Sequence, residues 1–561
     1  MKKLLSPLPA SATVPTESGR RRRRQQLGCT LGLLLAGCAE RYDIGAVGDT
    51  PQDLQAGDAP TELAQDPRSP LGVLLADGIE DADARLEGDS LLGAPGDLDG
   101  DGFDDVMVAT RELDRNPDLR IVRSHVLYGG PRPADGVVRL AQHSTELQLP
   151  ESEVLLLPQR SLRGDFDGDG TNDVLFSTYG GGSFSYAIEE DDAQNQAELT
   201  RRTADQRALL WLGARERPAQ VELTNAAVAF GDRDNLPSHF AQELAERDPA
   251  EAGYDASLSC QLSWLGDLDG DGLDDLALSS TFRVMWFREE YRPGTVTSVT
   301  TRQRRETISY IYYGGAQLVP GSEAPEPDVR LAGVTLTGMG DVNGDGFADL
   351  AVSSDGDSYY ALPGRAQRLR GETAALQLAV PLAMPVARPP VSVGDLDGDG
   401  FSDVIALGFE GDRSLTQLVY GSAELLDRPI DASQISAIFS VQGPANDVRE
   451  LGDYDGDGAN DLLFWNVFFS GDPAQPSTLQ PTRDELRLIR GGTQRFSGTY
   501  EVELEHAEPE GDERSGISVA STSAGDFDGD GRADVLMLRS IGDQTPMHIK
   551  FGGPLPERPL H

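Results

Sequence analysis

The sequence predicts an all-β protein built from seven similar repeats, each supplying four strands. Three observations predict this fold class. An acidic loop of one pattern occurs seven times, a short apolar strand follows every loop, and a second apolar strand ending in glycine lies further along each repeat. A pattern that returns this often is the repeating unit of an architecture. The loops begin at Asp97, Asp165, Asp267, Asp341, Asp395, Asp453 and Asp526.

The composition suits a folded, strongly acidic protein. Of the 561 residues, 38% are hydrophobic and 25% are charged. Asp and Glu total 93 against 48 Lys and Arg, which gives a formal net charge of −45. This charge argues against binding of nucleic acid or of an anionic membrane surface through a general positive field. Three cysteines are too few for a disulfide framework.

The amino terminus has the features of an export signal. Basic residues at 2–3 and 20–24 precede an apolar segment at 27–36 that is too short to span a bilayer as a helix. The sequence Leu35-Ala36-Gly37-Cys38 then resembles the lipobox of bacterial lipoproteins, which implies cleavage before Cys38 and lipidation of that cysteine. An ordinary secretory signal, cut at nearby small residues, is the alternative.

These features predict three parts of the chain. Residues 1–37 are expected to be a lipoprotein signal peptide, residues 38–70 a flexible tether, and residues 71–561 the folded domain. The expected location is that of an exported bacterial lipoprotein, at the outer membrane, the cell surface or the periplasmic face.

The residue types of each loop are those of a calcium site. In the first loop, positions one, three, five and nine are Asp97, Asp99, Asp101 and Asp105. Calcium prefers carboxylate and carbonyl oxygens, so the backbone carbonyl of Phe103 at position seven is expected to join them. Glycine at position six allows the sharp turn. The aspartates repel one another, so each loop is expected to be poorly ordered without a cation.

The other loops repeat these positions, which predicts up to seven structural calcium ions. In the same order of positions one, three, five, seven and nine, the expected ligands are Asp165, Asp167, Asp169, Thr171 and Asp173; Asp267, Asp269, Asp271, Leu273 and Asp275; Asp341, Asn343, Asp345, Phe347 and Asp349; Asp395, Asp397, Asp399, Phe401 and Asp403; Asp453, Asp455, Asp457, Ala459 and Asp461; and Asp526, Asp528, Asp530, Arg532 and Asp534.

The residues after the loops separate this pattern from an EF-hand, which needs a glutamate at position twelve and flanking helices. Positions ten to twelve are apolar in every copy, as in Val106-Met107-Val108, which predicts a strand buried on both faces. Acidic turns without metal are the alternative reading. Seven loops with the same closing aspartate and the same following strand favour metal sites.

The glycine-ending strands, such as Val126-Leu127-Tyr128-Gly129-Gly130, supply the second landmark. Together the loops and these endings resemble FG-GAP repeats, also described as VCBS-type repeats, which occur in the integrin α-subunit head and in bacterial surface proteins. The resemblance covers about residues 71–561. It implies a seven-bladed β-propeller of four-stranded blades with calcium in loops on one face, and it implies no particular activity.

Uneven spacing of the loops predicts insertions at about 180–206 and 214–262, with a short helix expected at 238–246. A degenerate extra blade within 174–262 is the alternative. Further long excursions fall at about 288–308 and 467–484. The chain ends just after its seventh glycine strand, so residues 71–76 are expected to supply the missing outer strand of blade seven and close the ring.

Two functions from different classes fit these features. The first is a calcium-stabilised, lipid-anchored scaffold of the cell envelope that binds a protein or a glycan without catalysis. The second is a propeller-type carbohydrate-active enzyme, a polysaccharide lyase or hydrolase. No recognisable catalytic constellation, nucleotide loop or dinucleotide fingerprint is found in the sequence, which favours the first.

Overall fold

The structure is a computed structural model, and its described residues all belong to one compact unit, Ala56–His561. The described residues are 73–75, 83–87, 90–113, 120–149, 153–156, 163–180, 185–190, 197–202, 207–230, 253–292, 295–315, 318–354, 358–372, 379–382, 384, 388–410, 413–442, 446–470, 480–502, 519–539 and 547–555. The predicted signal peptide, tether, Cys38 and the helix at 238–246 lie outside them.

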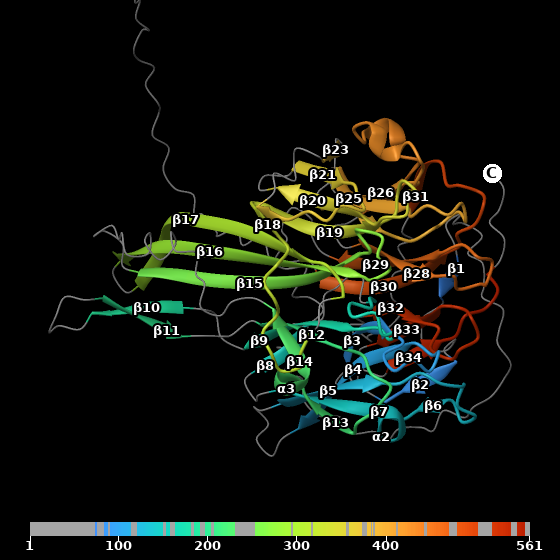
Figure 1. Ribbon diagram of the computed structural model, residues 1–561, viewed down its shortest axis with the longest axis horizontal. Coiled ribbons are helices and arrows are strands. Elements are labelled where there is room, and N and C mark those ends of the chain that lie inside the picture. Colours follow the sequence, from blue (N-terminus) through green and yellow to red (C-terminus); the bar gives the residue numbers. More distant parts are fainter. Residues whose placement is uncertain are drawn as a thin grey trace, which may run out of the picture. The chain divides into compact units, whose positions relative to one another are not determined.

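Seven mostly antiparallel sheets, one for each acidic loop, confirm the predicted seven-bladed all-β propeller (Figure 1). Each blade contains the strand before the loop, the strand after it, the glycine-ending strand and an outer strand. Blade by blade, these are β3 (Ser90–Gly96), β4 (Asp105–Leu113), β5 (Arg120–Leu127) and β7 (Ser144–Gln148); β8 (Glu153–Leu156), β9 (Val174–Gly180), β12 (Arg207–Trp211) and β14 (Ala227–Phe230); β15 (Gly253–Gly266), β16 (Asp275–Arg292), β17 (Thr295–Tyr312) and β18 (Val329–Ala332); β19 (Val334–Gly340), β20 (Asp349–Ser354), β21 (Ser358–Leu362) and β23 (Val380–Leu382); β24 (Val391–Ser392), β25 (Val404–Glu410), β26 (Arg413–Val419) and β27 (Ala437–Gln442); β28 (Asn446–Gly452), β29 (Asp461–Ser470), β30 (Gln480–Ile489) and β1 (Val73–Leu75); and β32 (Val519–Gly525), β33 (Asp534–Arg539), β34 (Met547–Lys550) and β2 (Ala84–Leu86).

The core lies between the blades. Val106 and Val108 flank Met107 in the strand after the first loop. Both are fully buried and pack with Phe527 and Leu536 of blade seven. Met107 points the other way, into the core shared with blade two. The apolar triplets after the loops are therefore buried on both faces, as expected for strands sandwiched between neighbouring blades.

Neighbouring blades also exchange strands, which the sequence did not reveal. A short segment after the glycine strand of blades one, two, four and six pairs in parallel with the outer strand of the preceding blade. These four segments are β6 (Val137–Val138), β13 (Gln220–Glu222), β22 (Gly371–Glu372) and β31 (Gly498–Val502). Blades seven, one, three and five thus have five strands, and blades two, four and six have four.

The ring is closed by the amino-terminal part of the chain, but not by the predicted strand. Strand β2 pairs with β34 and completes blade seven, with Leu86 and Ala84 buried in its core. Residues 73–75, within the predicted 71–76, instead pair with β30 as the outer strand of blade six. In blades one, two and four the exchanged strand is followed along the chain by the blade's own outer strand, β7, β14 or β23. After β31 the next described strand is β32 of blade seven, and β1 is the outer strand of blade six.

The structure treats the two predicted insertions differently. Residues 180–206 do hold an additional hairpin, whereas the described part of 214–262 supplies β13, the outer strand β14 of blade two and the start of β15, so the prediction of an insertion there was wrong for these residues. No extra blade is found among the described residues. Within the described part of 174–262, one four-stranded blade is accompanied by a two-stranded hairpin, β10 (Ser185–Glu190) and β11 (Ala197–Arg202). The excursion at 288–308 is the far end of the paired strands β16 and β17 (Figure 1). That at 467–484 extends β29 and β30 in the same way.

Helical structure is slight. The described helices are α2 (Leu140–His143), α3 (Leu223–Ala226) and two 3₁₀ turns, η2 (Leu425–Asp427) and η3 (Ala432–Gln434). None of the helices in the described part of the chain is long and apolar enough to cross a membrane.

Candidate metal centres

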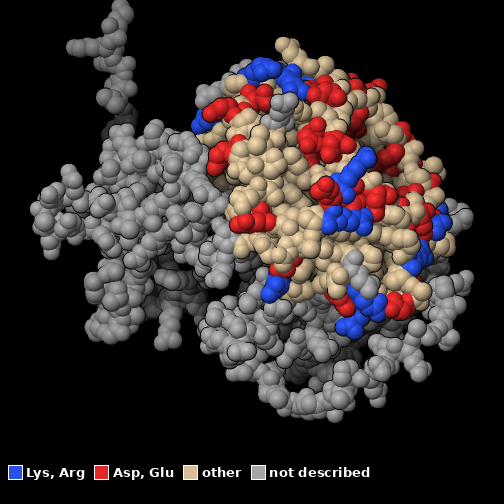
Figure 2. Space-filling view, turned by 60° about the horizontal axis from the view of Figure 1, so that its bottom comes forward, with Lys and Arg blue, Asp and Glu red and all other residues tan. Residues whose placement is uncertain are grey.

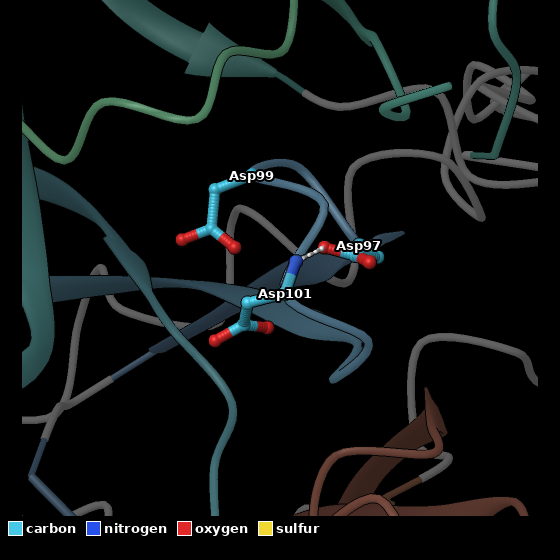
Figure 3. A group of neighbouring side chains, drawn as sticks. All are labelled: Asp97, Asp99 and Asp101. Atoms are coloured by element: carbon cyan, nitrogen blue, oxygen red, sulfur yellow. Dashed lines mark hydrogen bonds between the residues drawn. The ribbon is translucent and has the colours of Figure 1, made fainter.

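The first acidic loop shows how its sequence makes the turn (Figure 3). The Asp97 carboxylate accepts hydrogen bonds from the backbone N–H groups of Gly100 (2.7 Å), Asp101 (3.2 Å) and Gly102 (2.9 Å). Gly100 and Gly102 both have positive φ, at 71° and 91°, which glycine adopts without steric cost. The position-one aspartate therefore folds the loop around itself and brings positions three and five to the same side.

The position-nine aspartate anchors each loop to the glycine-ending strand. Asp105 is fully buried, and its two oxygens accept one hydrogen bond from Leu98 N and one from Gly129 N, both at 2.9 Å. The corresponding pair of bonds, 2.7–3.0 Å long, forms at Asp173, Asp275, Asp349, Asp403, Asp461 and Asp534.

The invariant glycine of these strands is needed because the backbones approach closely. A Cβ atom on Gly129 would lie closer than 3.0 Å to the carbonyl oxygens of Asp104 and Phe527. At all seven such glycines a Cβ would be closer than 3.0 Å to its nearest neighbour: Gly129, Gly213, Gly314, Gly364, Gly421, Gly491 and Gly552. The glycine that the sequence analysis placed at the end of each strand thus also lies in contact with the preceding blade.

Adjacent loops are joined in a continuous ring of backbone hydrogen bonds. The N–H at position eight donates to the position-one carbonyl of the preceding loop, as Asn172 N does to Asp97 O at 2.8 Å. The same bond closes the ring from Asp104 N to Asp526 O at 2.9 Å. The other five donors are Asp274, Ala348, Ser402, Asn460 and Ala533.

The position-seven side chains, which the sequence offered only through their carbonyls, have a second role. Phe103 packs its ring against the position-four glycine of the preceding loop, Gly529, leaving no room there for a Cβ. Leu273, Phe347, Phe401 and Arg532 cover the corresponding glycines of their preceding loops in the same way. Each loop therefore rests on its neighbour, so a change of order in one loop reaches the next.

The predicted ligands converge. In at least five loops, three aspartates can each bring one oxygen within 4.8 Å of the others. Five such groups are Asp97, Asp99 and Asp101; Asp165, Asp167 and Asp173; Asp267, Asp269 and Asp271; Asp395, Asp397 and Asp403; and Asp453, Asp455 and Asp461.

Unpaired buried oxygens show that these loops fit a cation. Asp99 Oδ1, Asp269 Oδ1 and Asp397 Oδ1, all at position three, are buried and have no hydrogen-bond partner within the described structure. Leaving a buried carboxylate oxygen without a partner is costly. Several carboxylates around one point are what a hard divalent cation such as calcium prefers. The residues present therefore fit a calcium ion, held by positions one, three, five and nine.

The electrostatics lead to the same conclusion. Burial, with a further contribution from Asp99 and Asp97, raises the pKa of Asp105 to about 8 in the metal-free chain. Burial likewise raises the pKa of the other position-nine aspartates to about 7 or 8: Asp173, Asp275, Asp349, Asp403, Asp461 and Asp534. A bound cation would favour the charged form and oppose this shift.

A pH dependence follows from these seven raised pKa values. An acid whose pKa is higher in the folded state stabilises the fold below its unfolded pKa, and that contribution is lost as pH rises through the folded pKa. In chelator, the melting temperature is therefore expected to fall between about pH 4 and pH 8, by ~10 °C or more. Calcium should suppress the fall. Melting curves recorded with and without calcium across this range check it; parallel curves would contradict it.

The tripeptide Arg163-Gly164-Asp165 belongs to the same ring of acidic loops. Arg163 forms an ion pair with Asp104 at 2.9 Å, and Asp165 is the position-one residue of the second loop.

The fold and the loops define a class: a seven-bladed β-propeller with an acidic loop before the second strand of every blade. Residues 341–406, which span the fourth loop to the strand after the fifth, match the family model of the FG-GAP-like repeat. The chain is thus a propeller with an FG-GAP-like repeat, and its other repeats share that loop and strand order. A comparison with curated proteins gave no match.

Proposed function

We propose that the protein is a calcium-stabilised, lipid-anchored propeller of the cell envelope that binds a protein or a glycan without catalysis. The observation that carries the proposal is how the acidic loops are buried and hydrogen-bonded. The position-nine carboxylates are buried and bonded to backbone N–H groups, and the loops are joined from blade to blade by backbone hydrogen bonds, so a cation held there would be structural. The lipid anchor rests on the sequence at Cys38 alone.

Blade three offers a surface for a partner. Its strands β16 and β17 remain paired up to Arg292 and Thr295, well past the first seven residues of β16, which end at Thr281. The remaining eleven residues of β16 reach about 36 Å at ~3.3 Å per residue. The hairpin β10–β11 contacts β15 beside them (Figure 1). Long elements on a rigid scaffold are where binding usually lies.

The charge of the surface limits the partner. Acidic side chains are spread over the face in Figure 2, with basic side chains in smaller groups between them. Together with the net charge of −45, this distribution disfavours nucleic acid. A protein or a neutral or basic glycan is the partner that we propose.

A matched pair of proteins tests the proposal. The full chain and a variant with residues 181–206 replaced by a short Gly-Ser turn are used to capture partners from cell envelopes in calcium. The turn can join β9 to β12 because these strands already pair, Thr178 with Arg207. We expect the same calcium-dependent melting for both but loss of the captured partner in the variant. Cleavage of polysaccharides by the full chain, measured as new sugar ends, would favour the enzyme instead.

Single loops can be tested separately. Asp99→Ala is expected to lower the number of bound calcium ions by one and the melting temperature by a few degrees, since one blade loosens while the ring persists. Asp427→Ala, at an exposed aspartate outside the loops, is the control. Calcium content and melting curves are the measurements, and an unchanged calcium content in Asp99→Ala would contradict the ligand assignment.

A further inference from the structure

Four arginines, each from the following blade, reach into an acidic loop. Arg217 of blade two donates from Nε to Asp99 Oδ2 and from a terminal nitrogen to Asp101 Oδ2. These are the position-three and position-five carboxylates of loop one. The same pair of bonds is formed by Arg368 with loop three, Arg495 with loop five and Arg132 with loop seven.

Each of these arginines lies over an aromatic ring of the blade that it reaches. The guanidinium carbon of Arg217 is 4.6 Å from the centre of the Tyr128 ring, which directly precedes the glycine of blade one. The other three pairs are Arg132 on Phe551, Arg368 on Tyr313 and Arg495 on Tyr420, at 4.5, 4.9 and 4.8 Å. A stacked guanidinium is a favourable contact with an aromatic face.

Ring and arginine occur together within this chain. In blades two, four and six the residue before the glycine is Leu212, Pro363 or Arg490. None of these is aromatic, and no arginine from the following blade pairs with loops two, four or six among the described residues. Loop six is reached instead by Arg490 of its own blade, which contacts Asp455 (2.6 Å) and Asp457 (2.8 Å). The ring and the arginine therefore form one unit.

A third contact holds the residue after the arginine. Tyr313 Oη accepts a hydrogen bond from Leu369 N at 3.0 Å, and Tyr420 Oη accepts one from Phe496 N at 2.8 Å. Where the ring is Phe551 and has no hydroxyl, the residue after Arg132 is a proline and has no N–H. In these three units the ring hydroxyl and the backbone N–H that donates to it are thus either both present or both absent.

In the fourth unit, the residue after Arg217 is also a proline, and the contact runs through a third side chain. Tyr128 Oη is 2.9 Å from Thr145 Oγ1, which donates to Pro218 O at 2.5 Å. These four segments are also the ones that continue into the exchanged strands β6, β13, β22 and β31. The ring, the arginine and the residue that follows it therefore fasten each exchanged strand to the loop of the preceding blade.

The arginine occupies only one side of the carboxylate. Asp99 Oδ2 is paired with Arg217, while Asp99 Oδ1 is buried and unpaired. The side chains of Asp99, Asp269, Asp397 and Asp528 are 1–5% exposed. In loops one, three and five the other oxygen, Oδ1 of Asp99, Asp269 or Asp397, is thus left for the cation. In loop seven, Asp528 Oδ1 accepts a hydrogen bond from Asp530 N at 3.1 Å. A guanidinium and a calcium ion on one carboxylate repel each other, and each lowers the repulsion among the aspartates.

We propose that Arg132, Arg217, Arg368 and Arg495 are built-in counter-ions of loops one, three, five and seven that compete electrostatically with calcium while fastening the exchanged strand. These four loops keep their shape when calcium is absent and bind it less tightly than they would without the arginine. The coupling is reciprocal: removing the arginine strengthens calcium binding and weakens the metal-free fold. The inference rests on the calcium binding proposed above.

The test is the full chain with all four arginines replaced by glutamine, R132Q/R217Q/R368Q/R495Q. Its melting temperature is expected to fall by more in chelator than in calcium, and its mean calcium dissociation constant to decrease about fivefold or more, measured by calorimetric titration. The fourfold Arg→Lys variant keeps the charges and is expected to stay closer to the unchanged chain in calcium affinity. Lysine that behaves like glutamine would overturn the counter-ion role.

A matched control removes the same charge elsewhere. Arg139, Arg215, Arg365 and Arg428 form no ion pair with a loop aspartate in the described structure, and their fourfold Gln variant should leave both quantities nearly unchanged. An equal loss of stability with and without calcium in the test variant would overturn the inference. If calcium neither binds nor stabilises the unchanged chain, the proposed function fails instead.

Discussion

Removing calcium is expected to lower the melting temperature of this protein by tens of degrees. A ligand that binds only the folded state stabilises it by about 2.7 kcal/mol at a hundred times its dissociation constant. Seven such sites in one cooperative ring would together contribute about 19 kcal/mol, more than the net stability of most domains. The measurement is a melting curve in excess calcium and another in excess chelator.

The controls for this prediction are the choice of cation and the pH. Magnesium is smaller and requires near-octahedral geometry, so it should restore less stability than calcium. The increment from calcium should be larger at pH 8 than at pH 5, because calcium needs deprotonated carboxylates and burial raises the pKa of Asp105 to about 8 without it. Coincident melting curves in calcium and in chelator would show that the loops are acidic turns that carry no cation.

Local sequence was enough to predict the loops and the strands beside them. The spacing from Asp97 to Asp105 encodes the turn, the convergence of carboxylates and the buried strand, all within thirteen residues. The glycine at 129 was also visible. The reason why a glycine is needed there could not be predicted, because the atoms that a Cβ would meet include the carbonyl oxygen of Phe527, at the other end of the chain.

Pairing between distant segments was not predictable from local pattern. Residues 71–76 are more apolar than 84–86, so hydrophobicity favoured the wrong strand for blade seven. The choice is made by contacts that the sequence does not display, among them Phe551 N donating to Asp83 Oδ2 at 2.9 Å. The exchanged strands were missed for the same reason. The sequence could have shown these arginines, since Arg217, Arg368 and Arg495 each lie four residues after the glycine that ends a strand. Arg132 lies three residues after Gly129.

The closing strand β2 carries the last prediction. A chain that begins at residue 79 loses only β1, the outer strand of blade six, and should melt a few degrees lower than the full chain. A chain that begins at residue 89 loses β2 as well and is expected to melt far lower. Leu86 is 1% exposed in the core of blade seven, and removing such a side chain alone costs about 2–5 kcal/mol.

The loss extends beyond that side chain, which is why the two truncations should differ so much. Backbone N–H groups of Arg85 and Glu87 donate to Gly136 and Val138, so β6 loses its partner strand together with β2. That frees the segment that carries Arg132 into loop seven, at the junction where the last blade meets the first. Both truncated chains, produced in the same way, are compared by melting in calcium. If the chain that begins at residue 89 melts at the same temperature as the chain that begins at residue 79, the ring is closed by the loop-to-loop hydrogen bonds and not by β2.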